Sequence, residues 1–585
     1  MPLTKAQKSI TSFYDISFWV ALSGLLIFII DYGFKQDEDV QHIFDTYYYV
    51  AIAIGLIATG FRYLQKIRRR LFKVIAFDTI FLGVAIYLFY KSFHEEYGFL
   101  HWFWNPGIFL KLLVLFTFIR ELSERKINFK RTTLNPAQLF IISFIALVLI
   151  GASLLLLPNA TTGNFTVLDA LFTSTSAVCV TGLAVVDTAT HFTDFGKTIL
   201  MILIQIGGLG ILTFASYFSY FFKGGSTYEN QLVLGDMTSS KRLNEVFSML
   251  KYILIITFGI EFTSAALIYF SLDSQLFSSF GDQVFFSIFH SVSSFCNAGF
   301  STLPNGLFNE GFRYNYGFQT IIILTFIFGG LGFPIVTNIL NFFKYKFLFL
   351  IRNKDRRLYK PWVLNINSRI TLITTISLFI IPTILFFFLE YNNTLTEHNW
   401  FGKIINAWFI AATPRTAGFN TVDMASLAFP TVMVMFLLMW VGASPQSTGG
   451  GIKTSTLAIA TLNIFSLAKG KSRIEIYRRE IADISVRRAF ATISLSLIVI
   501  GFGIMLISML EPQQDLKNIA FECYSAYSTV GLSLGITSDL NEWSKVILII
   551  IMFIGRVSML SIVIALMKKS KYKNYKYPTE EITIN

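Results

Sequence analysis

The sequence predicts an all-α membrane protein, and three observations lead to this fold class. Hydrophobic residues make up 54% of the 585 residues and charged residues only 14%, whereas soluble domains carry about 25% charged residues. Apolar runs of about 20 residues, long enough to cross a hydrocarbon core of about 30 Å, recur along the chain. A short pattern of small polar residues and glycine also occurs four times between such runs.

Twelve apolar runs are candidate membrane spans, and the charge of their connections predicts their direction. The connection at 66–73 (KIRRRLFK) carries five basic residues and no acidic one, whereas the connection at 35–45 is acidic. Under the positive-inside rule, this alternation predicts a multi-pass protein with both termini in the cytoplasm, and it explains the net charge of +13 without nucleic acid. The spans are expected near 16–34, 45–64, 74–93, 102–120, 136–157, 194–222, 249–272, 317–343, 369–390, 428–466, 488–510 and 544–567.

The first 133 residues hold four of these spans and lie outside the repeat described next. A voltage sensor is one interpretation, but it needs a basic residue at every third position of its fourth helix. Lys111, Arg120 and Arg125 do not supply that pattern, so packing at the periphery of the remaining protein is expected. The N-terminus has no small-residue cleavage site before its first apolar run, and we interpret it as a retained cytoplasmic tail.

Four stretches between the later spans indicate an internal repeat. They read LFTSTSAVCVTGL, IFHSVSSFCNAGF, AWFIAATPRTAGF and AFECYSAYSTVGL, and their glycines lie 117, 119 and 113 residues apart. An aromatic residue stands ten positions before each glycine, and the apolar run after each stretch contains a further glycine. The predicted unit is a helix, a short amphipathic segment, a glycine turn and a second helix. The aligned residues are Gly182, Gly299, Gly418 and Gly531, with Phe172, Phe289, Trp408 and Phe521 before them and Gly207, Gly329, Gly442 and Gly555 after them.

Each repeated stretch is too short and polar for another crossing and too apolar for a solvated loop. Non-helical backbone at membrane depth must be buried by protein or must line water, and a half-helix with an extended return satisfies this rule. The C-terminal end of the half-helix favours a cation. The return exposes carbonyls that can replace a hydration shell, and glycine permits the positive φ that aims them. Four such returns around one axis predict a cation filter without identifying the cation.

The runs SAVCVTGLAVVDT, LIQIGGLGILTF, SFCNAGFS, TPRTAGFNTVD, GASPQSTGGGIKTST and MFIGRVSML together resemble the Trk/Ktr/HKT superfamily of potassium transporters, in particular the bacterial Ktr/Trk-type membrane subunit. The resemblance covers about residues 134–568. It implies four helix–pore-loop–helix units around one pore in a homodimer, preceded here by about four extra transmembrane helices. The domains expected are an extension at 1–133, pore repeats at 134–235, 236–345, 346–470 and 471–570, and a cytoplasmic tail at 571–585.

The resemblance also implies a function and its residues. K⁺ uptake across the bacterial plasma (inner) membrane is expected, with K⁺ as the transported ion, no organic cofactor, and a cytosolic nucleotide-binding regulator-of-K⁺-conductance ring as partner. A Na⁺-permeable or Na⁺-coupled transporter is the alternative, although glycine in all four returns favours K⁺. The implied filter is the backbone of Val180, Thr181, Gly182, Asn297, Ala298, Gly299, Thr416, Ala417, Gly418, Thr529, Val530 and Gly531.

The third unit departs from the others because residues 441–456, inside its second apolar run, contain one proline and four glycines. Proline removes a helical hydrogen bond and glycine weakens a helix, so a broken helix is expected. A kinked structural helix is the simpler interpretation, whereas the resemblance implies a mobile intramembrane loop that obstructs the pore and contacts Arg556. The candidate gate comprises Gly442, Ala443, Ser444, Pro445, Gln446, Ser447, Thr448, Gly449, Gly450, Gly451, Lys453 and Arg556.

Other polar residues favour structural roles. Cys179 and Cys296 stand three residues before their glycines, but the matching positions in the third and fourth units are not cysteine, so packing is expected. Arg415 is interpreted as an anchor outside the conduction line. Asp187 and Asp423 either attract cations or cap short turns. No hydrolase motif and no metal spacing of the six histidines occurs, so an enzyme is not expected.

Overall fold

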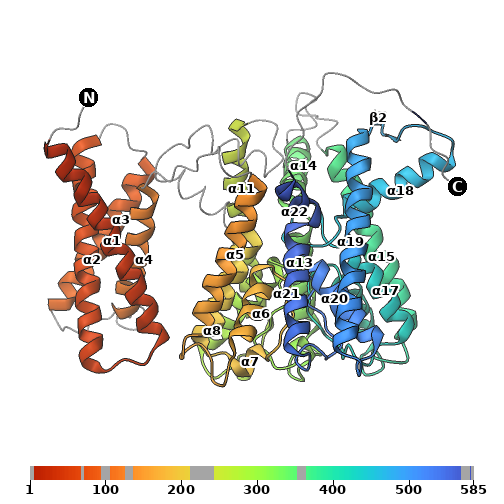
Figure 1. Ribbon diagram of the computed structural model, residues 1–585, viewed down its shortest axis with the longest axis horizontal. Helices are drawn as coiled ribbons and strands as arrows, with labels where there is room; N and C mark the ends of the chain where they lie inside the picture. The colour runs from red at the N-terminus through yellow and green to blue at the C-terminus, as the bar shows by residue number, and fades with distance from the viewer. Residues whose placement is uncertain are drawn as a thin grey trace.

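The computed structural model describes residues 5–66, 72–93, 106–124, 136–210, 243–351, 364–567 and 580 (Figure 1). Helices make up most of these ranges, and the only sheet within them is a hairpin of β1 (Glu475–Ile476) and β2 (Arg479–Glu480). The all-α prediction is therefore confirmed. Several segments used in the sequence analysis lie outside the described residues, namely most of the basic connections at 66–73 and 344–360, the second half of the 194–222 run, and the tail apart from residue 580.

The N-terminal extension is a bundle of four helices, which lies at one end of the molecule (Figure 1). Its members are α1 (Lys5–Gly33), α2 (Glu38–Lys66), α3 (Phe72–Phe93) and α4 (Pro106–Glu124), and they pack around a core that includes Tyr48, Ile52 and Val114. The four expected spans of the extension are thus present as four helices.

Buried ion pairs connect the helices of this bundle. Arg62 on α2 makes two hydrogen bonds to the Glu121 carboxylate on α4, at 2.8 and 2.5 Å. Arg120 lies 3.0 Å from Asp78. Charges within membrane helices are costly unless they are paired, and these pairs neutralise each other. These two pairs therefore join α2 and α3 to α4.

The four repeats follow the predicted order of helix, short helix, turn and helix. Their first long helices are α5 (Pro136–Leu155), α11 (Leu243–Ser271), α15 (Ile366–Leu389) and α19 (Asp483–Leu510); their pore helices are α6 (Val167–Val178), α12 (Phe280–Phe295), α16 (Trp400–Ala412) and α20 (Leu516–Ser528). The second helices are α8 (Asp194–Leu209), α13 (Tyr316–Gly330), α17 (Phe429–Trp440) and α21 (Glu542–Val557). Additional short or following helices are α7 (Thr188–His191), η3 (Ser274–Leu276), η4 (Gly306–Phe308), α14 (Phe333–Ile351), α18 (Thr454–Ala468) and α22 (Met559–Leu566).

Side-chain caps start the pore helices at defined points. Thr166 and Asp169 form a reciprocal capping box at the start of α6, while Ser279 and Asn399 cap α12 and α16. Such caps satisfy N–H groups that a helix start leaves without an intrahelical partner. The aromatic residues before the repeat glycines pack into the interior, where Phe172, Phe289 and Phe521 are fully or almost fully buried.

The expectation that only the third unit has a broken second helix is wrong. The first, second and fourth units break as well, at Gly210, Gly332 and Ser558, and all three residues have positive φ. The run at 317–343 is consequently not one straight span, because α13 and α14 meet at an angle of 106°. The third unit differs in the length of its irregular segment.

These breaks also shorten the helices available to cross the bilayer. Five helices among the described residues are long and apolar enough to span a membrane, and the bent pair of α13 and α14 makes a sixth if it counts as one span. A count of twelve straight crossings is therefore not observed in this part of the chain. Pore helices and half-helices account for much of the remaining apolar sequence.

Candidate functional site

The four repeat glycines form a closed ring. Each glycine ends a short non-helical segment that follows its pore helix, called the return strand here. A Cβ atom on any of the four glycines would collide with the carbonyl oxygen or a Cα atom of the next unit's return strand, so a side chain at any one position would displace the neighbouring strand. In each case the carbonyl belongs to the residue just before the neighbouring glycine. Around the ring, Gly182 meets Ala298, Gly299 meets Ala417, Gly418 meets Val530 and Gly531 meets Thr181.

The return strands share one backbone conformation. Each repeat glycine has a positive φ, between 71° and 93°, as the sequence analysis expects. The residue two positions before each glycine also has a positive φ, which the sequence analysis missed. Such angles are uncommon outside glycine and are unfavourable for a β-branched residue. The additional positive-φ residues are Val180, Asn297, Thr416 and Thr529, at 57°, 60°, 74° and 51°.

A hydroxyl group near the end of each pore helix anchors the return strand. Ser176 and Ser525 accept hydrogen bonds from the N–H groups of Gly182 and Gly531, at 3.0 and 3.1 Å. In the other two units, Ser293 donates to the carbonyl of Phe300 and Thr413 to that of Phe419, at 2.7 and 2.6 Å. The signal that the sequence analysis overlooked is a Ser or Thr five or six residues before each repeat glycine.

Glycines of the second helices let those helices approach the pore-helix ends. A Cβ on Gly207, Gly329 or Gly555 would collide with the carbonyl of the residue four positions before the repeat glycine of the same unit. Gly442 breaks this rule, because its nearest neighbour is the carbonyl of Gly450 in the irregular segment. In the third unit, a contact with the irregular segment therefore replaces the contact with the end of the pore helix.

A vestibule of about 510 Å³ opens on one side of the glycine ring. All four repeat glycines line it, together with two acidic residues, Asp187 and Asp423, and none of its lining residues is basic. Both carboxylates cap short turns, and cation attraction by them stays a prediction. Asp187 accepts from the N–H groups of Ala189 and Thr190, Asp423 accepts from that of Ala425, and both carboxylates border the vestibule.

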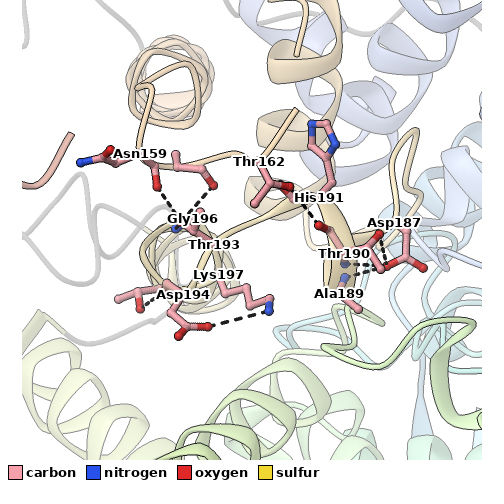
Figure 2. A network of polar contacts seen from close by, with 12 residues as sticks. Asn159, Thr162, Asp187, Ala189, Thr190, His191, Thr193, Asp194, Gly196 and Lys197 are labelled. Carbon is pink, nitrogen blue, oxygen red and sulfur yellow. Dashed lines mark hydrogen bonds and ion pairs between the residues drawn. The ribbon is translucent and has the colours of Figure 1, made fainter. Parts of the chain in front are cut away.

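The wall of the vestibule beside Gly182 is ordered by polar contacts (Figure 2). Asp187 caps the short helix α7, whose last residue is His191. The carbonyl of His191 accepts from the N–H of Thr162, at 2.9 Å. Thr193 then caps α8 through Gly196, and its hydroxyl donates to the Asn159 carbonyl at 2.6 Å. Figure 2 shows two neighbouring sets of contacts, one around Asn159 and Thr193 and the other around His191 and Asp187.

The irregular segment between α17 and α18 lies against the opposite end of the return strands. The Asn297 side-chain amide and the Thr448 hydroxyl form a hydrogen bond at 3.2 Å, and the N–H of Gly450 donates to the Thr529 hydroxyl at 3.0 Å. A Cβ on Gly449 would collide with the Thr416 hydroxyl. Three of the four positive-φ residues that precede the glycines thus contact this segment.

Two cations hold the segment through backbone carbonyls. Arg556 on α21 donates to the carbonyl of Thr448 and, at 2.5 Å, to that of Gly207 on α8. Lys453 donates to the carbonyls of Gly449 and Gly450, at 2.6 and 3.3 Å. Among the described residues neither cation forms an ion pair with a carboxylate, so both contribute positive charge below the glycine ring.

Most of the residues assigned structural roles have them. The three cysteines are buried and free. Arg415 donates to the Thr375 carbonyl, at 3.4 Å, and lies over the Phe379 ring on α15, away from the glycine ring. No group of three or more metal-ligating side chains occurs in the described ranges.

Two buried carboxylates have different partners. Glu261 accepts from Gln205 on α8 at 3.2 Å, which is a contact between helices. Glu522 accepts from Ser533, Leu534 and Thr537 and so holds a loop that lines the vestibule.

Comparisons with known proteins agree with this geometry. The family model described as "TrkH: Cation transport protein" matches residues 107–576. The chain is 35% identical over 453 residues to the Ktr system potassium uptake protein B of Bacillus subtilis, covering 77% of this chain and 96% of that protein. It is 34% identical over 464 residues to the potassium/sodium uptake protein NtpJ of Enterococcus hirae, covering 78% and 98%. The crystal structure of the potassium transporter TrkH from Vibrio parahaemolyticus has the same fold, with a TM-score of 0.60 at 16% identity over 85% of this chain and 99% of that chain.

Proposed function

Because the chain belongs to the TrkH family of cation transport proteins, we propose that it takes up K⁺ across the plasma membrane of a bacterium. The single observation that carries the proposal is the closed ring of four glycines, with the carbonyl of the preceding residue beside each neighbour. Backbone carbonyls in such an array replace the hydration shell of a monovalent cation. The two carboxylates of the vestibule attract cations to the outer end of this filter.

Na⁺ permeation or Na⁺ coupling is the second candidate. The name of the Enterococcus hirae relative includes both potassium and sodium, which supports Na⁺ transport as a second candidate. Glycine in all four filter positions favours K⁺, because no side chain narrows or reshapes the ring. Flux measurements with each ion alone separate the two candidates.

The segment from Gly442 to Gly451 is proposed to be the gate. It contacts Asn297, Thr416 and Thr529 directly below the ring, and Arg556 and Lys453 add positive charge there. A cation leaving the filter meets both a steric block and an electrostatic barrier. Deleting part of 444–451 should raise flux and remove its regulation, and unchanged flux and regulation would contradict a gating role.

The remaining assignments concern assembly. The names of two relatives describe components of Ktr systems, which supports further components as partners. A homodimer and a cytosolic nucleotide-binding ring are part of the proposal. Both termini are proposed to be cytoplasmic. The β1–β2 hairpin lies at the end of the molecule opposite α7, which is the vestibule side (Figure 1), so the hairpin is proposed to face the cytoplasm.

The decisive experiment measures ⁸⁶Rb⁺ flux into liposomes that contain the purified protein. The wild type should pass Rb⁺ and exclude Na⁺. Gly182→Ser should lose that selectivity, because its Cβ collides with the Ala298 carbonyl. Gly259→Ala is the matched control, since a Cβ there has open space in α11. Tight liposomes, together with failure to rescue a K⁺-uptake-deficient cell at low K⁺, would overturn the proposal.

A further inference from the structure

The N-terminal bundle contacts the pore repeats through the end of α1. The carbonyls of Gly33 and Tyr32 accept from the N–H and side-chain amide of Asn159, at 3.0 and 3.1 Å. The Tyr32 ring also stacks on Phe195 in the first turn of α8, with centroids 5.7 Å apart and planes 19° apart. The bundle therefore holds one short turn of the first repeat, at residues 157–160.

A buried ion pair keeps Tyr32 in place. The Lys111 ammonium lies 2.8 Å from the Asp31 carboxylate and 4.5 Å from the centre of the Tyr32 ring. Asp31 also accepts from the Tyr48 hydroxyl at 2.9 Å. The contact surface is thus fixed by α1, α2 and α4 together. Helices α1 to α3 precede the residues that the family model matches.

From that turn, hydrogen bonds connect to Thr193, which lies two residues after the end of α7 (Figure 2). The Asn159 carbonyl accepts from the Thr193 hydroxyl, and Thr193 donates its N–H to the carbonyl of Ala160 at 3.1 Å. Residues 161 and 192 form a β-bridge one step further on. The carboxylate of Asp187, which caps α7, lies four residues before His191 and borders the vestibule beside Gly182.

We propose that the N-terminal bundle acts as a clamp that positions Asp187 and thereby sets the apparent affinity of the filter for external K⁺. The proposal rests on the K⁺ uptake proposed above. A carboxylate in a vestibule without basic residues raises the local cation concentration, and the effect depends steeply on its distance from the filter. Loosening the turn at 157–160 lets α7 move, and with it the charge. The bundle residues are positioning residues, because they act through Asp187 and none of them belongs to the filter.

The test measures Rb⁺ flux as a function of external Rb⁺ in liposomes at low ionic strength. Asp187→Asn removes the charge and keeps a capping side chain, so it should raise the half-saturation concentration about two- to threefold. Tyr32→Leu should give a similar rise with an unchanged maximal rate. In the double variant the two effects should not add, because no charge remains to be positioned. Choline chloride at high concentration should abolish each effect by screening.

Controls separate positioning from folding. Ser23→Ala removes a hydrogen bond to Tyr47 within the bundle, at 2.5 Å, and should behave as wild type. Thr193→Val should raise the half-saturation concentration, whereas Thr193→Ser keeps the hydroxyl and should not. This pair supplies the test if Tyr32→Leu does not fold.

Three results would overturn the clamp. The first is additive effects of Tyr32→Leu and Asp187→Asn on the half-saturation concentration. The second is a lowered maximal rate with an unchanged half-saturation concentration in Tyr32→Leu, and the third is an equal half-saturation concentration for the two Thr193 variants. Each leaves the proposed K⁺ uptake intact, because the wild type still conducts. Absence of flux in the wild type would instead overturn the proposed function.

Discussion

The Arg556 guanidinium donates a hydrogen bond to the carbonyl of Thr448, although the two residues are 108 positions apart. The same guanidinium holds the carbonyl of Gly207, so one side chain joins the fourth unit, the irregular segment and the first unit. Both partners are neutral carbonyl groups, so they do not compensate the positive charge of the guanidinium. This arrangement keeps the proposed gate under the glycine ring and places a positive charge on the proposed path of the ion.

Arg556→Gln should therefore increase flux in the absence of any partner protein. Hydrogen bonds to a charged group contribute about 1.5–3 kcal/mol, so their loss shifts a closed gate toward the open state by about tenfold or more. Rb⁺ flux in liposomes of the purified protein measures this directly. Arg415→Gln is the matched comparison, because Arg415 is buried against α15 and should affect stability more than basal flux. Unchanged or lower flux in Arg556→Gln would contradict a role of Arg556 in holding the gate closed.

Ser176→Ala should reduce ion selectivity with little change in folding. Its hydroxyl accepts the Gly182 N–H at 3.0 Å, and losing a buried partner costs about 1–3 kcal/mol. That cost falls on the return strand, so the first quarter of the filter should loosen. The ratio of Rb⁺ to Na⁺ flux gives the readout. Thr175→Val, which removes only a hydrogen bond to Leu171 within α6, should leave the ratio unchanged; equal ratios for both variants would contradict the anchor.

Gly555→Ala should destabilise the fourth unit. A Cβ at this position collides with the Tyr527 carbonyl at the end of α20, and such overpacking costs about 1–3 kcal/mol. Thermal unfolding in detergent should show a lower Tm. Gly501→Ala in α19 provides the control, since it meets nothing within 4 Å and should be neutral or slightly stabilising. A Tm equal to that of the control would show that α21 can move away from α20.

The repeat and its glycines could be predicted from the sequence because each carries a physical requirement. Gly182 and its three counterparts need positive φ and close approach, and only glycine supplies both without strain. The broken helix of the third unit could be predicted for a similar reason, since Pro445 and its neighbouring glycines oppose a helix. Arg556 stood out as a charge within an apolar run, which must find partners.

Other features could not be predicted, or their signals were missed. Val180 is β-branched and disfavours positive φ, so only the packing of the whole ring imposes its conformation. Ser558 ends α21 with a φ of 73°, although the local sequence shows no helix breaker. The bend between α13 and α14 did have a signal in Gly332 and Pro334. The stacking of Tyr32 on Phe195 joins distant segments and has no local pattern.

His398 should make stability depend on pH on the vestibule side of the protein. It lies in the loop between α15 and α16, where Tyr316 and Asn406 are its hydrogen-bond partners. Burial lowers its pKa below the ordinary value, and the nearby Arg313 and Lys403 cations lower it further, against the opposing effect of Glu397. The neutral ring is therefore favoured in the folded protein.

The direction of the pH dependence follows from the difference in proton binding between the unfolded and the folded protein. As pH falls below about 6.5, the unfolded chain binds a proton at this histidine before the folded protein does, so stability is lost toward the lower folded pKa. The wild-type Tm should thus fall more between pH 7.5 and 5.5 than that of His398→Gln, whose side chain keeps a polar partner but does not titrate. His42→Gln replaces an exposed histidine on α2 and should follow the wild-type curve. Parallel curves for wild type and His398→Gln would mean that other groups carry the acid sensitivity.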